Sequence, residues 1–473
     1  MPEPSPYPLL LLLSLLSLQA ATVASASEYS GRINLGAYQS KETFTDPVSG
    51  SNSNDAQEVL GSAYFDATGI GPFRNEFTLD LRDKYDSFGQ VDTGAPRLVT
   101  SNEPQLRQLA VKYPYEEGNV FWALGRFPVA DAAVLGNDGA ELGYKVTQHV
   151  SLGLFGGLYP EQREGRTVLV TQEEHQEGLV VTYQEHGTGW DHSTYFTTAF
   201  VGRQPVTGSQ DPDAPITAPP DATQPVTVAE DEPLDPYVFW YTNLVLQASA
   251  ATRYTFLSHV DLQPAAHVRN IWASAYHQMN PRLSGNVSLF RIDLTEYERQ
   301  RDIRDLLPAS AYTAGRGEAR YKLTRTVQLV GDASAGVRSA DNKSHAEANG
   351  KIVATSVASG HLSLFAGGGY RKSFISHDQI ARAGVSAYAS RVEFDLTQQA
   401  ITEQHDNDET LHPLITDASV SFFLVDAVVT SATVEYAKDE RTTITSGLLT
   451  LGYRFNSRQL TPVRDRAPAL ERL

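Results

Sequence analysis

The sequence predicts an all-β protein, a single antiparallel transmembrane β-barrel, and three observations support this fold class. Apolar and polar residues alternate with a period of two from one end of the chain to the other, which is typical of strands. Many alternating segments run for about ten to thirteen residues, the length that a tilted strand needs to cross a membrane. Long and short connectors also alternate along the chain, as they do between the two ends of such a barrel.

The N-terminus has the features of a secretory signal peptide. Leu9 to Leu18 is an apolar block of ten residues, and Ala24-Ser25-Ala26 is a small-residue cleavage site. The block is too short to span a membrane as a helix, and no later stretch reaches eighteen apolar residues. We therefore expect residues 1–26 to be removed on export, and we exclude a helical-bundle membrane protein.

Composition excludes several classes of function. The chain has 473 residues and no cysteine, which excludes a disulfide framework, a Cys-ligated metal centre and a thiol nucleophile. Its formal charge of −18 argues against a nucleic-acid partner, because phosphate binding needs clustered Lys and Arg. Nothing in the sequence calls for a cofactor.

Two strand candidates show the alternation most clearly. In residues 73–85, Phe77, Leu79 and Leu81 share one face, and charged residues occupy the other. In residues 391–398, Val392, Phe394 and Leu396 alternate with charged residues in the same way. In a barrel the apolar face meets lipid and the polar face lines the lumen. Together with the last strand, these segments give the candidate lumen and selectivity residues Arg74, Glu76, Asp80, Arg82, Arg391, Glu393, Asp395 and Arg454.

The rival fold is a set of soluble β-sandwiches, which would divide the chain into domains of roughly one hundred to two hundred residues. No domain breaks occur at that spacing. Aromatic residues gather at strand ends, as in Tyr237 to Tyr241, and glycines are frequent inside strands, where a soluble sheet would be weakened by them. One barrel over residues 27–455 fits better.

We predict 22 strands, the upper end of a range of 16 to 22. They lie near residues 29–38, 57–67, 73–84, 104–113, 118–127, 139–145, 149–159, 177–185, 190–202, 237–248, 253–261, 267–277, 284–294, 312–322, 326–337, 348–358, 361–371, 380–386, 390–398, 415–424, 427–437 and 442–455. The long connectors follow odd-numbered strands, and span 39–56, 85–103, 128–138, 160–176, 203–236, 295–311, 338–347 and 399–414.

Several motifs resemble those of bacterial outer-membrane porins. The run Ala123 to Phe127, then Asn137 to Tyr144 and Leu154 to Gly157, is similar to a strand–loop–strand run of that family. The end of the last strand, with Tyr453 and Phe455, resembles the aromatic signal read by the barrel-assembly machinery. The resemblance implies residence in the outer membrane among lipid and lipopolysaccharide, and a homotrimer as one arrangement. Residues 456–473 depart from the family, because its members usually end at the aromatic residue; we expect a periplasmic tail.

A barrel of this size is too wide for side chains to fill, so we expect a water-filled lumen. Its mixed charges either tune selectivity or pair across strands and hold the register. If the connector 128–138 folds inward, Arg126, Asp131 and Asp138 would form a constriction.

Three other features give no site. The insertion 204–236 has eight prolines and seven acidic residues without Lys or Arg, and we expect an extracellular, solvated loop; shielding of the pore mouth and divalent-cation binding are the alternatives. The cluster 405–409 lacks the ligand spacing of a calcium loop. Ser–His neighbours such as His149 with Ser151 and His361 with Ser363 do not single out a catalytic set, so we expect no enzyme and no metal site.

The sequence therefore predicts an outer-membrane channel that passes hydrophilic solutes through a polar lumen. One alternative is a dedicated export barrel for polysaccharide or another secretion pathway, which would depend on periplasmic partners. The other is a surface structural or adhesion barrel whose loops are the active part.

Overall fold

The computed structural model describes most of the barrel. The described residues are 28–46, 50–89, 98–102, 105–113, 118–133, 135–160, 174–186, 192–205, 237–263, 266–293, 311–339, 341–374, 376–405, 409–425 and 427–456. The predicted signal peptide, most of the insertion 204–236, nearly all of the C-terminal tail and residues 406–408 of the acidic cluster lie outside them. No helix of the described part is long and apolar enough to cross a membrane.

The described strands form one antiparallel sheet. They are β1 Glu28–Asp46, β2 Gly50–Ile70, β3 Asn75–Gly89, β4 Leu98–Asn102, β5 Gln105–Tyr113, β6 Val120–Val129, β7 Leu135–Lys145, β8 Val150–Leu158, β9 Glu174–His186, β10 Ser193–Pro205, β11 Tyr237–Ser249 and β12 Thr252–Gln263. The chain continues with β13 His267–Asn280, β14 Leu283–Ile292, β15 Tyr312–Lys322, β16 Val327–Arg338, β17 Ser344–Ser356, the short helix α2 Val357–Gly360, β18 Leu362–Lys372, β19 Ser376–Ala389, β20 Val392–His405, β21 Thr410–Leu411, β22 Leu414–Val425, β23 Val428–Lys438 and β24 Thr442–Asn456.

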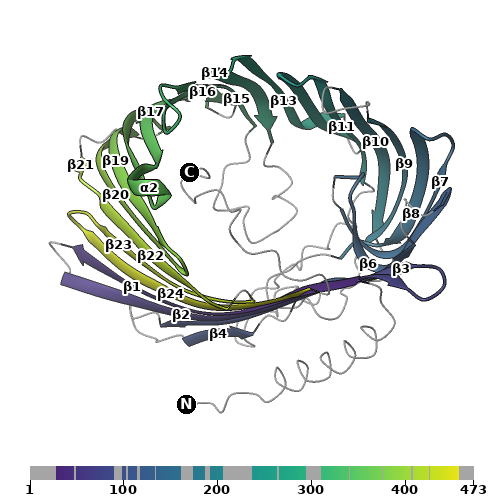
Figure 1. The fold of residues 1–473 in the computed structure, drawn as a ribbon, viewed down its shortest axis with the longest axis horizontal. Helices are drawn as coiled ribbons and strands as arrows, with labels where there is room; N and C mark the ends of the chain where they lie inside the picture. Colours follow the sequence, from purple (N-terminus) through teal and green to yellow (C-terminus); the bar gives the residue numbers. More distant parts are fainter. Residues whose placement is uncertain are drawn as a thin grey trace, which may run out of the picture.

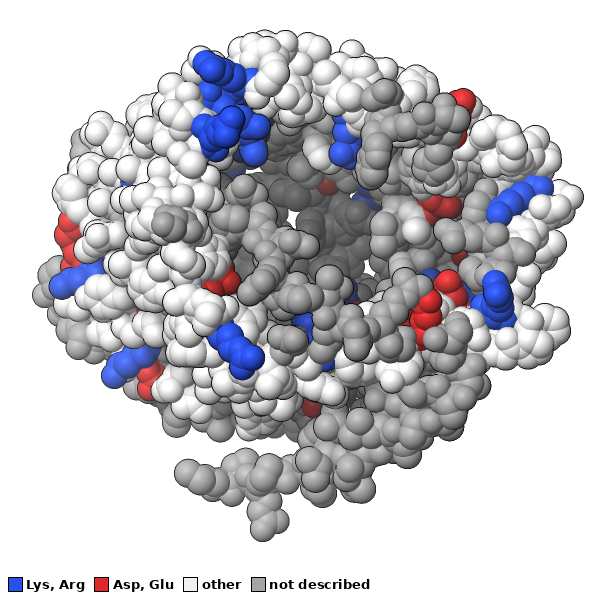
Figure 2. Space-filling view, viewed as in Figure 1, with Lys and Arg blue, Asp and Glu red and all other residues white. Residues whose placement is uncertain are grey.

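The sheet closes on itself, because β1 pairs with β24 from Ser30↔Asn456 to Phe44↔Thr442. The two short strands share places with longer ones: β4 pairs with β3 beside β5, and β21 pairs with β20 beside β22. Counting each shared place once, the described barrel has 22 strands, which confirms the predicted fold class and count. Figure 1 shows the closed ring, and Figure 2 shows that its centre is hollowed.

Several of the predicted connectors contain strand, among them 39–56, 85–103, which holds the end of β3 and all of β4, and 399–414, which holds the end of β20 and all of β21. Residues 39–56 were predicted to be a long loop, but β1 and β2 stay paired from Gln39↔Gln57 to Asp46↔Gly50, so only residues 47–49 join them. Paired backbones satisfy each other's hydrogen bonds and need no apolar side chains to continue, so this extension leaves no hydrophobic pattern in the sequence. The longest connectors, between β8 and β9, β10 and β11, and β14 and β15, still leave one end of the barrel. The turns at the other end are short, as between Ala389 and Val392.

The outer face of the barrel carries an apolar belt. Large apolar side chains are exposed on this face. Several are direct partners on neighbouring strands, for example Leu154 beside Leu179 and Phe200 beside Trp240. Others on this face are Leu35, Val59, Val287, Leu289, Ile352, Leu364, Phe394, Phe422, Val434 and Leu449. Water does not favour such a belt, whereas a bilayer does, and closure removes every unpaired strand edge from the hydrocarbon. The geometry is that of an outer-membrane barrel.

Glycines allow large rings to lie flat against the wall at four places. In each, a phenylalanine is the direct cross-strand partner of a glycine, and a side chain on that glycine would collide with the ring. The pairs are Phe121 with Gly143, Phe155 with Gly178, Phe365 with Gly384, and Phe455 with Gly31. Ring-over-glycine pairs pin the register of designed and natural barrels.

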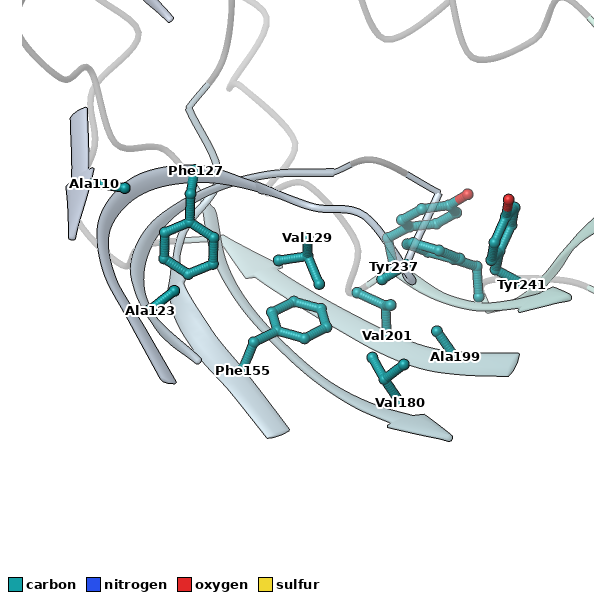
Figure 3. Close-up of a cluster of buried hydrophobic side chains, with 12 residues drawn as sticks. Ala110, Ala123, Phe127, Val129, Phe155, Val180, Ala199, Val201, Tyr237 and Tyr241 are labelled. Carbon is teal, nitrogen blue, oxygen red and sulfur yellow. The ribbon is translucent and has the colours of Figure 1, made fainter. Parts of the chain in front are cut away.

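Part of the inner wall is a hydrophobic core rather than a wet surface. Its buried members come from β5, β6, β8 to β11 and the turn between β6 and β7, as Figure 3 shows for Phe127, Val129, Phe155 and Val201. Ala132, in that turn, is fully buried in this cluster. The end of the β6–β7 hairpin therefore lies against the inside of the barrel and covers this sector.

Candidate lumen site

Three cations share one row of the inner wall on β15, β17 and β19. The register joins Arg320 to Lys351 through one residue of β16, and Lys351 to Arg382 through Gly367 of β18. Directly paired residues point to the same face of a sheet. The residues next to these cations in the sequence, such as Tyr321 and Ile352, are exposed on the lipid face, so the three cations face the lumen. Lys351 interacts electrostatically with both arginines.

Acidic groups partner some cations of this sector. The Nε of Arg320 lies 2.5 Å from Oε1 of Glu318 on the same strand. On β19, Asp378 is completely buried and accepts hydrogen bonds from Arg371 Nε at 2.5 Å and from Ser376 Oγ at 2.9 Å. These pairs support the reading of lumen charges as register-holding contacts, but only for part of the sector.

The neighbouring sector, on β20, β22 and β23, is acidic. Asp417 and Glu435 are directly opposite each other across β22 and β23, an arrangement of like charges that destabilises a sheet. Asp395 accepts hydrogen bonds from the hydroxyls of Ser386 and Ser419, the latter at 3.4 Å. Glu393 and Glu403 share its face of β20. On the described parts of these three strands, no Lys or Arg occupies the same face. The lumen therefore has a cationic wall beside an acidic one.

The predicted lumen residues lie in two kinds of position, on strand faces and in short turns. Glu76, Asp80 and Arg82 share one face of β3, and Glu76 is paired with Lys112 of β5. Arg454 lies directly opposite Arg32 on the closing strand pair. Glu393 and Asp395 belong to the acidic wall described above.

Arg74 and Arg391 are not on strand faces as the alternation predicted; both lie in short turns. Arg74 has φ of 52°, and its backbone N–H donates to the carbonyl of Gly71 at 3.2 Å. Arg391 lies in the β19–β20 turn and donates from Nη1 to the carbonyl of Leu424 at 2.9 Å. Alternation cannot show where a tight turn interrupts a strand.

The three residues expected at a constriction separate into two groups. Arg126 and Asp138 are direct partners across β6 and β7 and form a two-bond ion pair, Nε to Oδ1 at 2.6 Å and Nη2 to Oδ2 at 2.5 Å. Both side chains are nearly buried, and each neutralises the charge of the other. Asp131 lies in the turn beyond them.

Asp131 fastens the hairpin to the inner wall. Its carboxylate accepts hydrogen bonds from the hydroxyls of Thr182, at 3.1 Å, and of Tyr195. Its backbone carbonyl accepts one from Thr197 at 3.2 Å. The connector between β6 and β7 thus folds inward and is held to β9 and β10.

A buried polar network that the sequence did not indicate lies on β11 to β13. The Tyr237 hydroxyl donates to Asp261 at 2.5 Å and lies 3.1 Å from His259 Nε2. Arg269 Nε donates to the other oxygen of Asp261 at 2.5 Å. Lumen residues that were also not named from the sequence are Lys351, Arg382, Asp417 and Glu435. Alternation within each strand puts them on the polar face, but only the register between strands shows which wall of the lumen each belongs to.

The Ser–His neighbours do not meet as catalytic pairs. His149 Nδ1 lies 3.1 Å from the carbonyl of Gln184, and His361 Nδ1 lies 3.1 Å from that of Tyr388. Within the described ranges, no group of three or more His, Asp or Glu side chains could hold a metal ion.

Comparison with known proteins gives similarity of structure only. No protein-family model matches the chain, and no curated protein matches it. Among solved structures, OccK7 (OpdD) of Pseudomonas aeruginosa covers 91% of this chain over 100% of its own, with 7% identity and a TM-score of 0.45. The translocation pore of the P pilus usher PapC covers 90% over 99%, with 9% identity and a TM-score of 0.45. OccAB4 of Acinetobacter baumannii covers 91% over 99%, with 8% identity and a TM-score of 0.41.

The fold class follows from three features of the structure: the closed ring, its apolar outer belt and its charged inner face. A sheet with no free edge and a lipid-compatible exterior is one of only two backbone arrangements that cross a bilayer. The expected fold class is confirmed: the chain forms a single closed antiparallel β-barrel with the apolar exterior of a membrane-spanning barrel.

Proposed function

We propose that this barrel is a channel that passes small hydrophilic solutes by diffusion through its lumen. The supporting observation is the division of lumen charge: Arg320, Lys351 and Arg382 form a cationic row, while Asp395, Asp417 and Glu435 belong to the acidic wall beside it. A barrel that served only as a structural anchor would gain nothing from opposed like charges on its inner face, because they destabilise the sheet.

Adjacent walls of opposite sign produce a field across the lumen. A solute with both positive and negative groups aligns in such a field, while an apolar solute must displace the water oriented by the charged walls without replacing its interactions. Water and small polar solutes are therefore the cargo class that fits, and charged solutes should be sorted by sign.

The test is single-channel conductance of the purified, refolded full chain in a planar bilayer without any partner protein. We expect stable steps whose size rises with salt concentration. Absence of conductance at every voltage would contradict a diffusion channel and favour a gated export barrel instead.

The field is tested by reversal potential in a potassium chloride gradient. Replacing the opposed acids in Asp417→Asn/Glu435→Gln should shift the reversal potential toward anion preference, and Lys351→Gln/Arg382→Gln should shift it toward cation preference. The partly exposed pair Glu58 and Lys84 gives the matched control, in Glu58→Gln/Lys84→Gln. Equal shifts for both acidic and basic replacements would contradict the assignment of the two walls.

A further inference from the structure

An apolar groove lies on the outer face of the barrel, across β16 to β20. It has a volume of about 540 Å³. Its lining includes Ile352, Ala354, Leu364, Ala383, Val385 and Leu396. Alanines between larger side chains create the depression, and Ile352, Leu364 and Leu396 are exposed on the lipid face.

The groove lies close to the short-turn end of the barrel. Register places Val327, Ala354 and Leu364 side by side across three strands, and Leu364, Val385 and Leu396 continue the same level. Val327 directly follows the β15–β16 turn, residues 323–326. Short turns face the periplasm in outer-membrane barrels, so the groove is at the level of the periplasmic leaflet.

Two cations lie in the turns at this end of the barrel. Arg325 lies in the β15–β16 turn, and Arg282 lies in the neighbouring β13–β14 turn, where its backbone carbonyl accepts the Lys322 N–H at 2.8 Å. Within the described part of the chain, neither of these two arginines has an acidic partner. In Figure 2 the Lys and Arg side chains gather over β15 and β16 on this end of the barrel.

The two features are close enough to act on one molecule. Arg325 is two residues before Val327, which lines the groove, and the exposed Leu323 lies in the same turn. A bilayer already covers the groove with hydrocarbon, but only a lipid with a negative headgroup would also neutralise the cations beside it.

We propose that this groove and turn bind an anionic phospholipid, with an acyl chain along Leu364 and Val385 and the phosphate beside Arg325 and the neighbouring Arg282. The site is separate from the lumen and does not depend on the channel function, because its apolar lining is on the opposite face of the wall.

Native mass spectrometry of the full chain, released from detergent micelles, tests the proposal. The probes are phosphatidylglycerol and phosphatidylcholine with identical acyl chains. We expect phosphatidylglycerol to be retained at least tenfold more than phosphatidylcholine. Arg325→Gln/Arg282→Gln should lower its retention at least fivefold, and Ala383→Phe, which fills the groove, should do the same. Ala366→Leu repeats the groove test with a smaller side chain.

Two variants serve as controls. Arg253→Gln removes a cation from another part of the same barrel end, and Ala432→Phe adds a ring to the lipid face of β23, away from the groove. Both should retain phosphatidylglycerol like the parent chain. Equal retention of the two lipids, or equal losses in the controls, would overturn the proposal. So would a loss confined to the charge variants, since it would show that the turn holds the headgroup without any contribution from the groove.

Discussion

Arg126 and Asp138 form a nearly closed ion pair at the base of the β6–β7 hairpin, with side chains only 11% and 14% exposed. A third bond runs from Arg126 Nη1 to the carbonyl of Leu106 at 2.7 Å. The pair joins three consecutive strands and fixes the point from which the hairpin turns into the barrel.

Removing one member of this pair should destabilise the barrel. Asp138→Leu leaves a buried guanidinium without its carboxylate, which costs about 3 kcal/mol in comparable pairs. The free energy of unfolding, measured by urea titration in lipid vesicles, should fall by that amount, and Arg126→Leu/Asp138→Leu should recover part of it. In the more exposed and looser pair Lys84 and Glu58, 3.5 Å apart, Glu58→Gln should change the free energy of unfolding by less than about 1 kcal/mol. Equal effects at both pairs would contradict this prediction.

The inward position of the hairpin should depend on the donors to Asp131. Tyr195→Phe/Thr182→Val removes both hydroxyls that bond its carboxylate, so the turn should leave the wall part of the time. We expect more frequent current steps in single-channel recordings. Tyr183→Phe is the control, because its hydroxyl bonds Glu185 on the same strand instead. Recordings indistinguishable from the parent would show that the apolar contacts of Ala132 hold the hairpin unaided.

A side chain on Gly178 should impair folding. Its Cβ would lie 2.5 Å from two ring atoms of Phe155, and overpacking of this kind costs about 1–3 kcal/mol. The folded fraction of Gly178→Ala, read from heat-dependent gel mobility after refolding, should fall, and Phe155→Leu in the same chain should restore part of it. Gly317→Ala is the matched control, since nothing lies within 4 Å of its added carbon. Equal yields from both glycine variants would be evidence against register pinning by this ring.

The β16–β17 turn should lose order in acid. The Arg338 guanidinium, which bonds both oxygens of Asp341, lowers the pKa of that carboxyl to about 2. A carboxyl with a depressed pKa in the folded state stabilises the turn above its ordinary pKa of 3.8 and loses this effect as pH falls toward 2. The Lys343 amide, which donates to Asp341 at 3.1 Å, should lose protection from hydrogen exchange in that window.

Asp341→Asn should remove this dependence on pH at the Lys343 amide. Asp439→Asn, in the β23–β24 turn, replaces a carboxylate that accepts only backbone N–H groups from Arg441 and Thr442, and it should leave the Lys343 profile unchanged. Loss of protection at Lys343 near neutral pH in the parent chain would contradict the stated pKa.

Phe455 shows how one residue can carry two interpretations. As a terminal aromatic it predicts an assembly signal, and that role stays a prediction. In the structure its ring lies against Gly31 on the first strand and stacks 6.2 Å from Phe65. It therefore also closes the barrel, a role that needs the pairing of the two ends of the chain.

The sequence by itself determined the strands, their number and the face each residue takes, because side chains alternate strictly along a strand. Leu364 and Phe394 could be assigned to lipid, and Asp395 to the lumen, from that alternation alone. Only the tertiary structure decided which residues meet. Arg320, Lys351 and Arg382 are far apart in the chain and align only through the register of five strands, which backbone hydrogen bonds and ring–glycine contacts set. The inward fold of the β6–β7 hairpin likewise required the wall against which it packs.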